Sequence, residues 1–299
     1  MKTVFIGLDG IAWSVVLPYI KNGQMPNINY LVRKGSWGIL ESIVPPVTGC
    51  AWLSLATSLN PGKTGVIDFL KLDENLRLKP VSSHDFKDKA FWDILSKKGV
   101  RVAVLDYPML YPAYPVNGVI VSSFLGFLDT YPKTLKRELK GIVGDYDILV
   151  PYYDEKYNDI DLFFQDLEEA LNKKIRITEH ILNYTKWDLF VNIIPFTDWL
   201  LHRTWCYIDR NYPLYNEEES KKILPKINDF WRRIDSLIGK MLRQTNYVFI
   251  ASDHGMGPQH GCFNIAKWLN MRGYLVKKFS LASTFKSLIL KMGKYKAVR

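Results

Sequence analysis

Cysteine is scarce in this sequence. The chain has 299 residues and three cysteines, Cys50, Cys206 and Cys262. They are odd in number and lack the paired spacing of a structural zinc site. This usage favours free thiols in a reducing compartment and argues against a disulfide-stabilised scaffold.

Long hydrophobic runs are also missing. No window of the sequence approaches the roughly 18 consecutive apolar residues that a membrane-spanning helix needs. The apolar stretch at the N-terminus is broken early by Asp9, and no small-residue cleavage site follows it closely, which argues against a signal peptide. We therefore expect a cytoplasmic protein.

Nucleic-acid-binding motifs of the RNP, zinc-knuckle or basic–aromatic type are lacking. We expect no specific nucleic-acid binding, although the net charge is +10. The C-terminal stretch 277–299 contains basic residues and no acidic ones. It is either a solvated tail or an amphipathic helix in weak contact with anionic membranes, because Leu281, Phe285, Leu288 and Met292 recur at helical spacing. The sequence does not indicate an oligomeric state.

Short apolar runs alternate with longer amphipathic stretches along the chain. Runs typical of buried strands lie at 3–8, 101–105, 116–121, 187–194 and 247–251. Stretches with helical periodicity lie at 26–34, 90–98, 160–184 and 217–243. Strands that alternate with helices predict an α/β fold with a mostly parallel sheet and helices on both faces.

No clean linker divides the chain. We expect one α/β domain over 1–276, with an inserted helical and loop segment at about 107–186, and a basic tail over 277–299. Residues 106–115 carry several prolines and predict an irregular surface loop.

Acidic residues stand where apolar runs end. Asp9, Asp198 and Asp253 follow predicted strands, and His254 comes directly after Asp253. Ligands bind beyond the carboxyl ends of parallel strands, so these side chains would converge on one edge if the strands are neighbours. An adjacent carboxylate and imidazole suit a metal ion or, alternatively, an ordinary turn. Asp106 also ends a run, but no His or Gly accompanies it, so we assign it to turn chemistry.

Two other residues extend this constellation. His202 follows Asp198 at i+4, which places both on one face of a helix, as in a metal site or in an ordinary exposed pair. Thr48 directly precedes a helical stretch that ends near Ser58, where threonine is ordinarily an N-cap. The N-terminus of a helix also binds phosphoryl groups, and a metal-bound threonine alkoxide there could act as a nucleophile.

Short motifs in a fixed order surround these residues. They are GLDG (7–10), PPVTGCAW (45–52), NPGKTG (60–65), TDWLLH (197–202) and SDHGMGP (252–258). Together the motifs resemble the type I phosphodiesterase/nucleotide pyrophosphatase branch of the alkaline phosphatase superfamily, in order and in spacing. The resemblance implies an alkaline-phosphatase-like catalytic domain that is short at its C-terminus.

The resemblance also implies a hydrolase of small phosphate esters or nucleotides that uses two divalent metal ions, usually zinc and sometimes manganese. The ligands implied by the motifs are Asp9, Thr48, Asp253 and His254 for one ion, and Asp198 and His202 for the other. Thr48 would attack phosphorus and give a phosphothreonine intermediate, which a metal-activated water then hydrolyses.

The chain departs from the family pattern in places. Thr64 stands where relatives often have His, and Asp68 and Phe69 stand where pyrophosphatases carry a phosphate-binding Asn. Relatives take another His ligand for the second metal from a C-terminal segment, and no His follows His260 in this sequence. The third ligand is therefore His260 or a residue outside this sequence. The alternative to an enzyme is a truncated, catalytically weak remnant that binds metal or phosphate.

Overall fold

A computed structural model describes residues 1–299 with the exception of 76, 124–127 and 277–299. The predicted basic tail therefore lies outside the described residues. The chain divides into two compact units, Met1–Pro258 and Gln259–Arg299. Helix α10 (Ile265–Met271) belongs to the second unit, and none of its residues is buried.

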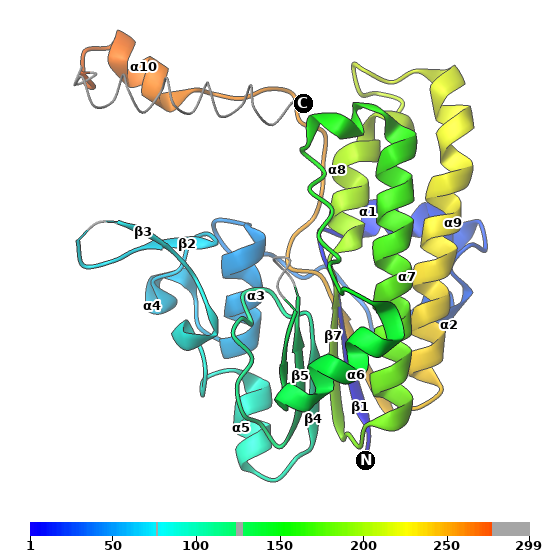
Figure 1. The fold of residues 1–299 in the computed structure, drawn as a ribbon. Coiled ribbons are helices and arrows are strands. Elements are labelled where there is room, and N and C mark those ends of the chain that lie inside the picture. Colours follow the sequence, from blue (N-terminus) through cyan, green and yellow to red (C-terminus); the bar gives the residue numbers. More distant parts are fainter. Residues whose placement is uncertain (76, 124–127, 277–299) are drawn as a thin grey trace. The chain divides into compact units, whose positions relative to one another are not determined.

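A six-stranded sheet with the order β6–β5–β4–β7–β1–β8 forms the centre of the first unit (Figure 1). Its strands are β6 (Asp129–Tyr131), β5 (Gly118–Ser122), β4 (Val102–Leu105), β7 (Leu189–Ile194), β1 (Thr3–Leu8) and β8 (Tyr247–Ala251). Neighbouring strands are parallel except for the antiparallel pair β5–β6. This confirms the predicted α/β fold with a mostly parallel sheet.

Helices connect these strands. They are α1 (Trp13–Lys21), α2 (Pro26–Lys34), α3 (Thr48–Thr57), α4 (Pro61–Thr64), α5 (Phe91–Lys97), α6 (Lys133–Val143), α7 (Ile160–Tyr184), α8 (Phe196–Ile208) and α9 (Glu217–Leu242). A short hairpin of β2 (Leu70–Leu72) and β3 (Leu78–Pro80) follows α4. The predictions of helices at 26–34 and 160–184 agree with α2 and α7 to the residue.

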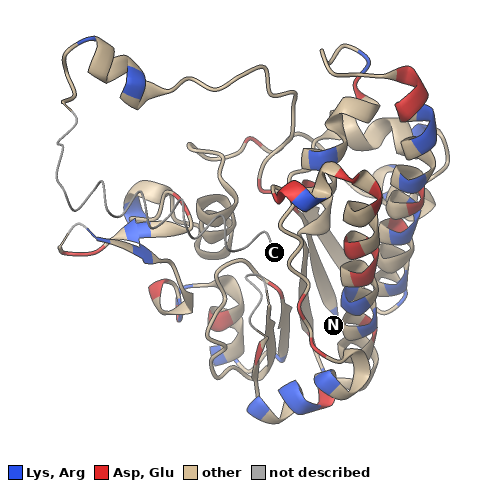
Figure 2. Cartoon of the chain, turned by 45° about the horizontal axis from the view of Figure 1, so that its top comes forward, with Lys and Arg blue, Asp and Glu red and all other residues tan. Residues whose placement is uncertain are grey.

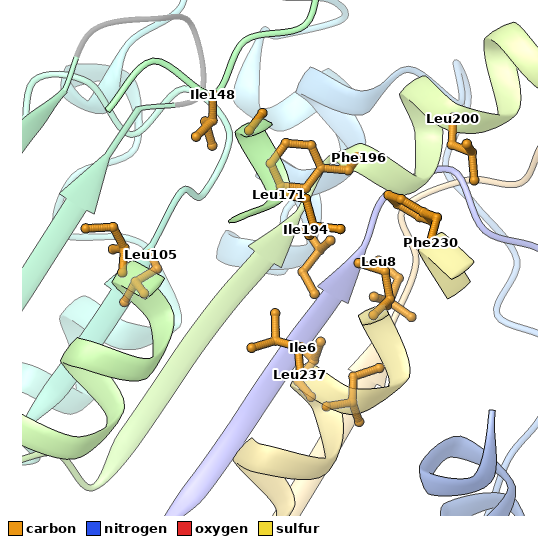
Figure 3. Close-up of a cluster of buried hydrophobic side chains, with 14 of the residues drawn as sticks. Ile6, Leu8, Leu105, Ile148, Leu171, Ile194, Phe196, Leu200, Phe230 and Leu237 are labelled. Atoms are coloured by element: carbon orange, nitrogen blue, oxygen red, sulfur yellow. The ribbon is translucent and has the colours of Figure 1, made fainter. Parts of the chain in front are cut away.

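Two hydrophobic cores cover the two faces of the sheet. Side chains alternate between the faces of a strand, so Ala103 and Leu105 of β4 enter one core and Val102 and Val104 enter the other. The first core packs against α1, α2, α6, α7, α8 and α9, and Figure 3 shows part of it. The second core packs against α3 and α5. Because both faces are covered, the strands appear in the sequence as continuous apolar runs.

The segment 106–115 is irregular, as its prolines predict, but its prediction as a surface loop is wrong. Tyr107, Leu110 and Tyr114 are buried in the second core. The indole Nε1 of Trp92 donates a hydrogen bond of 2.9 Å to the Tyr114 hydroxyl. Proline prevents regular helix and strand pairing, but it does not determine whether the surrounding side chains are exposed.

Charged residues are interspersed on the long helices. Figure 2 shows Lys and Arg alternating with Asp and Glu along α7 and α9, which is typical of helix faces in contact with water. Within the described part of the chain, none of the helices has the combination of length and apolar character required to cross a membrane.

Candidate metal centre

The candidate site lies at the carboxyl ends of three adjacent strands. β1 lies between β7 and β8, with Leu8 paired to Ile194. Asp9 follows β1 directly, Asp253 follows β8, and Asp198 lies in the first turn of α8, which begins just after β7. The prediction that these acids converge on one edge if the strands are neighbours is therefore confirmed.

A first set of donor atoms surrounds the imidazole of His254. Its Nε2 lies 3.0 Å from Thr48 Oγ1, 3.4 Å from Asp253 Oδ2 and 3.5 Å from Asp9 Oδ1. Ligands that bind zinc tetrahedrally at 2.0–2.1 Å lie about 3.3 Å from one another. The three distances are therefore those expected between ligands of a single tetrahedral ion.

The orientation of His254 is fixed by its other ring nitrogen. Nδ1 lies 2.9 Å from the carbonyl oxygen of Gly255, which can only accept, so Nδ1 carries the hydrogen. The lone pair of the neutral ring is then on Nε2 and faces Thr48, Asp9 and Asp253. The Ser252 hydroxyl donates to the His254 carbonyl at 2.7 Å and holds this loop in place.

Thr48 is the first residue of α3, and the alternative interpretation of Thr48 as its N-cap is wrong. Val47 occupies the N-cap position, with φ −109° and ψ 133°, and no side chain caps the helix. The Thr48 hydroxyl is instead directed at His254. The positive end of the α3 dipole lies beside this hydroxyl and favours an anionic ligand there.

The segment that departs from the family pattern lies against this helix end. A Cβ atom at Gly49 would come within 3.2 Å of the Phe69 amide nitrogen and 3.3 Å of the Asp68 carbonyl. Asp68 and Phe69 therefore lie next to the residue that follows Thr48. The departure from the family pattern at Asp68 and Phe69 therefore lies beside the candidate nucleophile.

Three carboxylates at this edge each have one buried oxygen that makes no hydrogen bond. Among the described residues, Asp9 Oδ1, Asp198 Oδ1 and Asp253 Oδ2 are buried and make no hydrogen bond. Ligand atoms of Asp9, Asp198 and His254 all lie within 4.8 Å of one another. Buried carboxylate oxygens normally have a donor or a cation as partner. The donor set therefore fits a divalent cation bound among these oxygens.

Burial and neighbouring charges raise the pKa values of Asp9 and Asp253. Burial, followed by the negative charges of Asp253 and Asp198, raises the pKa of Asp9 well above its usual value. Burial raises the pKa of Asp253 to about 6, with a smaller contribution from the charge of Asp198. Both shifts therefore arise first from the burial of the carboxylates and only second from neighbouring negative charge.

A second donor set lies on α8. Asp198 and His202 share one face of this helix, as predicted, with 3.4 Å between Asp198 Oδ1 and His202 Nε2. The His202 ring stacks on the ring of Tyr152, with centroids 4.3 Å apart and an interplanar angle of 5°. Burial and the nearby charges of Asp198 and Asp9 raise the pKa of Tyr152 to about 12. His260, the other candidate ligand, belongs to the second unit.

Several supporting residues were not singled out by sequence reasoning. The indole Nε1 of the buried Trp52 donates to Asp9 Oδ2 at 3.2 Å, and the amide of Gly10 donates to Asp253 Oδ1 at 3.2 Å. Gly10 has φ +69°, and a Cβ there would lie 2.7 Å from Asp198 Oδ1. Trp52 and Gly10 lie within recognised motifs, which was an available signal, whereas no motif contains Tyr152.

Asp106, the other acid that follows a strand, has a different environment. Its assignment to turn chemistry accounts for its backbone, with φ 54°, but not for its side chain. The carboxylate is fully buried and lies 2.5 Å from the ammonium of the fully buried Lys174. It also accepts hydrogen bonds from the hydroxyls of Tyr146, at 2.8 Å, and Ser123.

This fold and site agree with comparisons to known proteins. The sequence profile of the Type I phosphodiesterase / nucleotide pyrophosphatase family matches residues 3–297, so the chain belongs to this family. A search of curated protein sequences gave no match.

Solved structures of similar fold are longer than this chain. Phosphonoacetate hydrolase from Sinorhizobium meliloti 1021, in complex with phosphonoformate, has a TM-score of 0.58 at 15% identity, covering 91% of this chain and 62% of its own. Murine ectonucleotide pyrophosphatase / phosphodiesterase 5 has a TM-score of 0.50 at 14% identity. The superposition covers 85% of this chain and 57% of the murine chain. At these identities the similarity shows a shared α/β fold.

Proposed function

We propose that this protein hydrolyses a phosphate ester by way of a phosphothreonine intermediate at Thr48, with two divalent metal ions, zinc or alternatively manganese. The observation that carries the proposal is the arrangement of donor atoms around His254 Nε2, together with the unpaired carboxylate oxygens. Family membership supports the reaction class. The substrate would be a small phosphodiester, phosphomonoester or nucleotide.

Asp9, Thr48, Asp253 and His254 would hold one ion, and Asp198 and His202 would supply two ligands of the other. When bound, such ions neutralise the carboxylates and stabilise negative charge on the oxygens that are attached to phosphorus. The end of α3 would contribute its free backbone N–H groups to the phosphoryl oxygens.

Thr48 would be the nucleophile. Its hydroxyl would give up its proton to water, and Oγ1 would form a bond to phosphorus while the bond between phosphorus and the leaving oxygen breaks. The hydroxyl lies 3.0 Å from His254 Nε2, so Oγ1 belongs to the same donor set as that imidazole. Water then cleaves the bond between Oγ1 and phosphorus, which releases the phosphoryl product and restores the threonine hydroxyl.

The two donor sets differ in completeness. The first offers four ligand residues, whereas the second offers Asp198 and His202 within the first unit. Two ligands seldom hold zinc firmly, so we expect one ion to bind tightly and the other weakly. A further ligand would be needed to complete the second set. If the second ion does not bind, the protein would be the alternative considered above, a catalytically weak remnant that binds metal or phosphate.

Replacing the nucleophile tests the proposal. The Thr48→Ala variant should lose hydrolysis of bis-p-nitrophenyl phosphate by about 10³-fold or more in the presence of zinc or manganese, because the attacking oxygen is gone. Its unfolding free energy should change little, because the Thr48 side chain does not cap α3. Thr48→Ser should keep measurable activity, since the hydroxyl remains.

Thr57→Ala is the matched control. Thr57 ends the same helix, and its hydroxyl bonds to the Leu53 carbonyl at 2.8 Å. This variant should keep wild-type turnover. If Thr48→Ala retains most of the activity, the assignment of Thr48 as nucleophile is wrong.

A further inference from the structure

An aromatic residue outside every motif contacts the second donor set. The rings of Tyr152 and His202 are nearly parallel, at 5°, with centroids 4.3 Å apart. Tyr152 lies between α6 and α7, in an irregular stretch whose Ile148 and Val150 are buried. Its amide donates to the Val150 carbonyl at 2.8 Å, which forms a turn within the stretch, and the buried side chains of Ile148 and Val150 anchor the stretch close to the tyrosine ring.

His202 needs such a support more than His254 does. Its side chain is 38% exposed, compared with 13% for His254. His254 is fixed through Nδ1 by the Gly255 carbonyl, whereas the polar partner of His202 is Asp198, itself a candidate ligand. An exposed imidazole samples several rotamers, and ligand histidines are usually oriented by a further neighbour. At His202 the neighbour is an aromatic face.

We propose that Tyr152 is a positioning residue for the second metal ion, and that its ring holds the imidazole of His202 in the rotamer that ligates. The proposal rests on the proposed function, because it requires His202 to be a ligand. Tyr152 does not need to touch the ion or the substrate. The expected consequence of losing its ring is a weaker second metal, with the first metal unaffected.

Substitutions of Tyr152 separate the ring from the hydroxyl. Tyr152→Phe keeps the aromatic face and should bind the second zinc within about twofold of wild type. Tyr152→Leu removes the face and should weaken the second zinc about tenfold, the size of effect usual when the support of a ligand is lost. If Phe and Leu weaken it equally, the hydroxyl and not the stack is responsible, and the proposal is wrong.

Tyr153→Leu is the control for general disturbance of this stretch. Tyr153 is 77% exposed and contacts the edge of Tyr152, with centroids 5.6 Å apart. We expect this variant to bind both zinc ions as the wild type does. An equal loss in Tyr153→Leu and Tyr152→Leu would contradict a specific role for the stack.

The experiment titrates the chelator-treated full chain with zinc against a chromophoric chelator, for wild type, His202→Ala and the tyrosine variants. If His202→Ala binds the second zinc normally, the proposed function is wrong about that ligand. If His202→Ala loses it and Tyr152→Leu does not, the positioning role of Tyr152 is wrong.

The proton NMR signals of the His202 ring, measured without metal, give a readout that does not depend on catalysis. The ring current of Tyr152 should shift them upfield in wild type and in Tyr152→Phe but not in Tyr152→Leu. Identical His202 shifts in all three proteins would overturn the stack, whether or not the leucine variant loses stability.

Discussion

Two groups of buried charge lie at the carboxyl ends of strands of the same sheet, and they are balanced in opposite ways. After β4, the Asp106 carboxylate meets the Lys174 ammonium and two hydroxyls. After β1 and β8, Asp9 and Asp253 meet each other, and each keeps an oxygen that makes no hydrogen bond among the described residues. The chain itself neutralises the first group, whereas the second brings like charges together beside His254.

This difference separates Asp106 from the acids that we propose as metal ligands. Both kinds follow a strand and both are buried, so position in the sheet does not distinguish them. The counter-charge does: a lysine from α7 reaches Asp106, whereas the other acids are surrounded by further acids and by His254. Unbalanced buried carboxylates cost stability, and a site that keeps them has a ligand to bind.

The largest expected effect on stability concerns the ion pair of Asp106 and Lys174. Lys174→Met should lower the unfolding free energy by about 3–5 kcal/mol, because it leaves the Asp106 carboxylate buried and uncompensated. Zinc should not restore this loss. Denaturant unfolding with and without zinc measures both effects.

Two controls accompany the Lys174 variant. Lys173→Met removes a neighbouring lysine whose partner Glu169 is 65% exposed, and it should cost less than about 1 kcal/mol. Lys174→Met combined with Asp106→Asn should recover part of the loss, since the unpaired charge is gone. A Lys174→Met protein as stable as wild type would contradict the ion pair.

The next largest effect on stability concerns zinc binding to the group of Asp9, Asp253 and His254. Zinc at about 100 times its Kd should stabilise wild type by about 3 kcal/mol, because it binds the folded chain and supplies the missing charge. Thermal unfolding across a zinc titration measures this gain. Asp253→Asn should remove most of it, and an unchanged gain in that variant would exclude Asp253 as a ligand.

The smallest effect concerns the metal-free protein. Asp253→Asn should stabilise it at pH 7 by on the order of 1–2 kcal/mol, because the amide removes a charge that the fold disfavours. The pKa of Asp253 is raised to about 6 by burial, above its unfolded value of roughly 3.9. The folded state therefore binds more protons, and this group lowers stability as pH rises from about 4 to 6. The gain from Asn should disappear near pH 4.

Asp188→Asn should change the stability of the protein in the opposite direction. Hydrogen bonds from Arg101 lower the pKa of Asp188 to about 2, so its charge stabilises the fold above pH 4, and that contribution is lost as pH falls toward 2. The asparagine variant should therefore be less stable than wild type at pH 7. If both asparagine variants shift stability in the same direction, the contrast between the two kinds of acid is wrong.

Much of this arrangement could be predicted from sequence. Parallel strands that are buried on both faces give continuous apolar runs, so β1 and β7 were recognisable, and the edge strand β8 is also a continuous apolar run although Tyr247 and Phe249 are exposed. The i, i+4 spacing of Asp198 and His202 placed both residues on one face of a helix. Helix α6 was missed, although its apolar positions have helical spacing, because no cap or glycine marked its start.

The rest depends on contacts between distant segments. Nothing in the sequence near Asp106 shows that Lys174, from another helix, reaches it. The stack of Tyr152 on His202 likewise joins segments that are linked only through the fold. Prolines in 106–115 fixed the irregular backbone but not its burial, which follows from packing against Trp92 and its neighbours.

The most direct test of the account is the number of zinc ions that the chain binds. Equilibrium dialysis of the full chain against rising zinc, read by elemental analysis, should show one ion bound tightly and a second bound much more weakly. Both should weaken as acid protonates the ligands. A chain that binds neither zinc nor manganese would contradict the claim that these buried carboxylates and His254 form a metal centre.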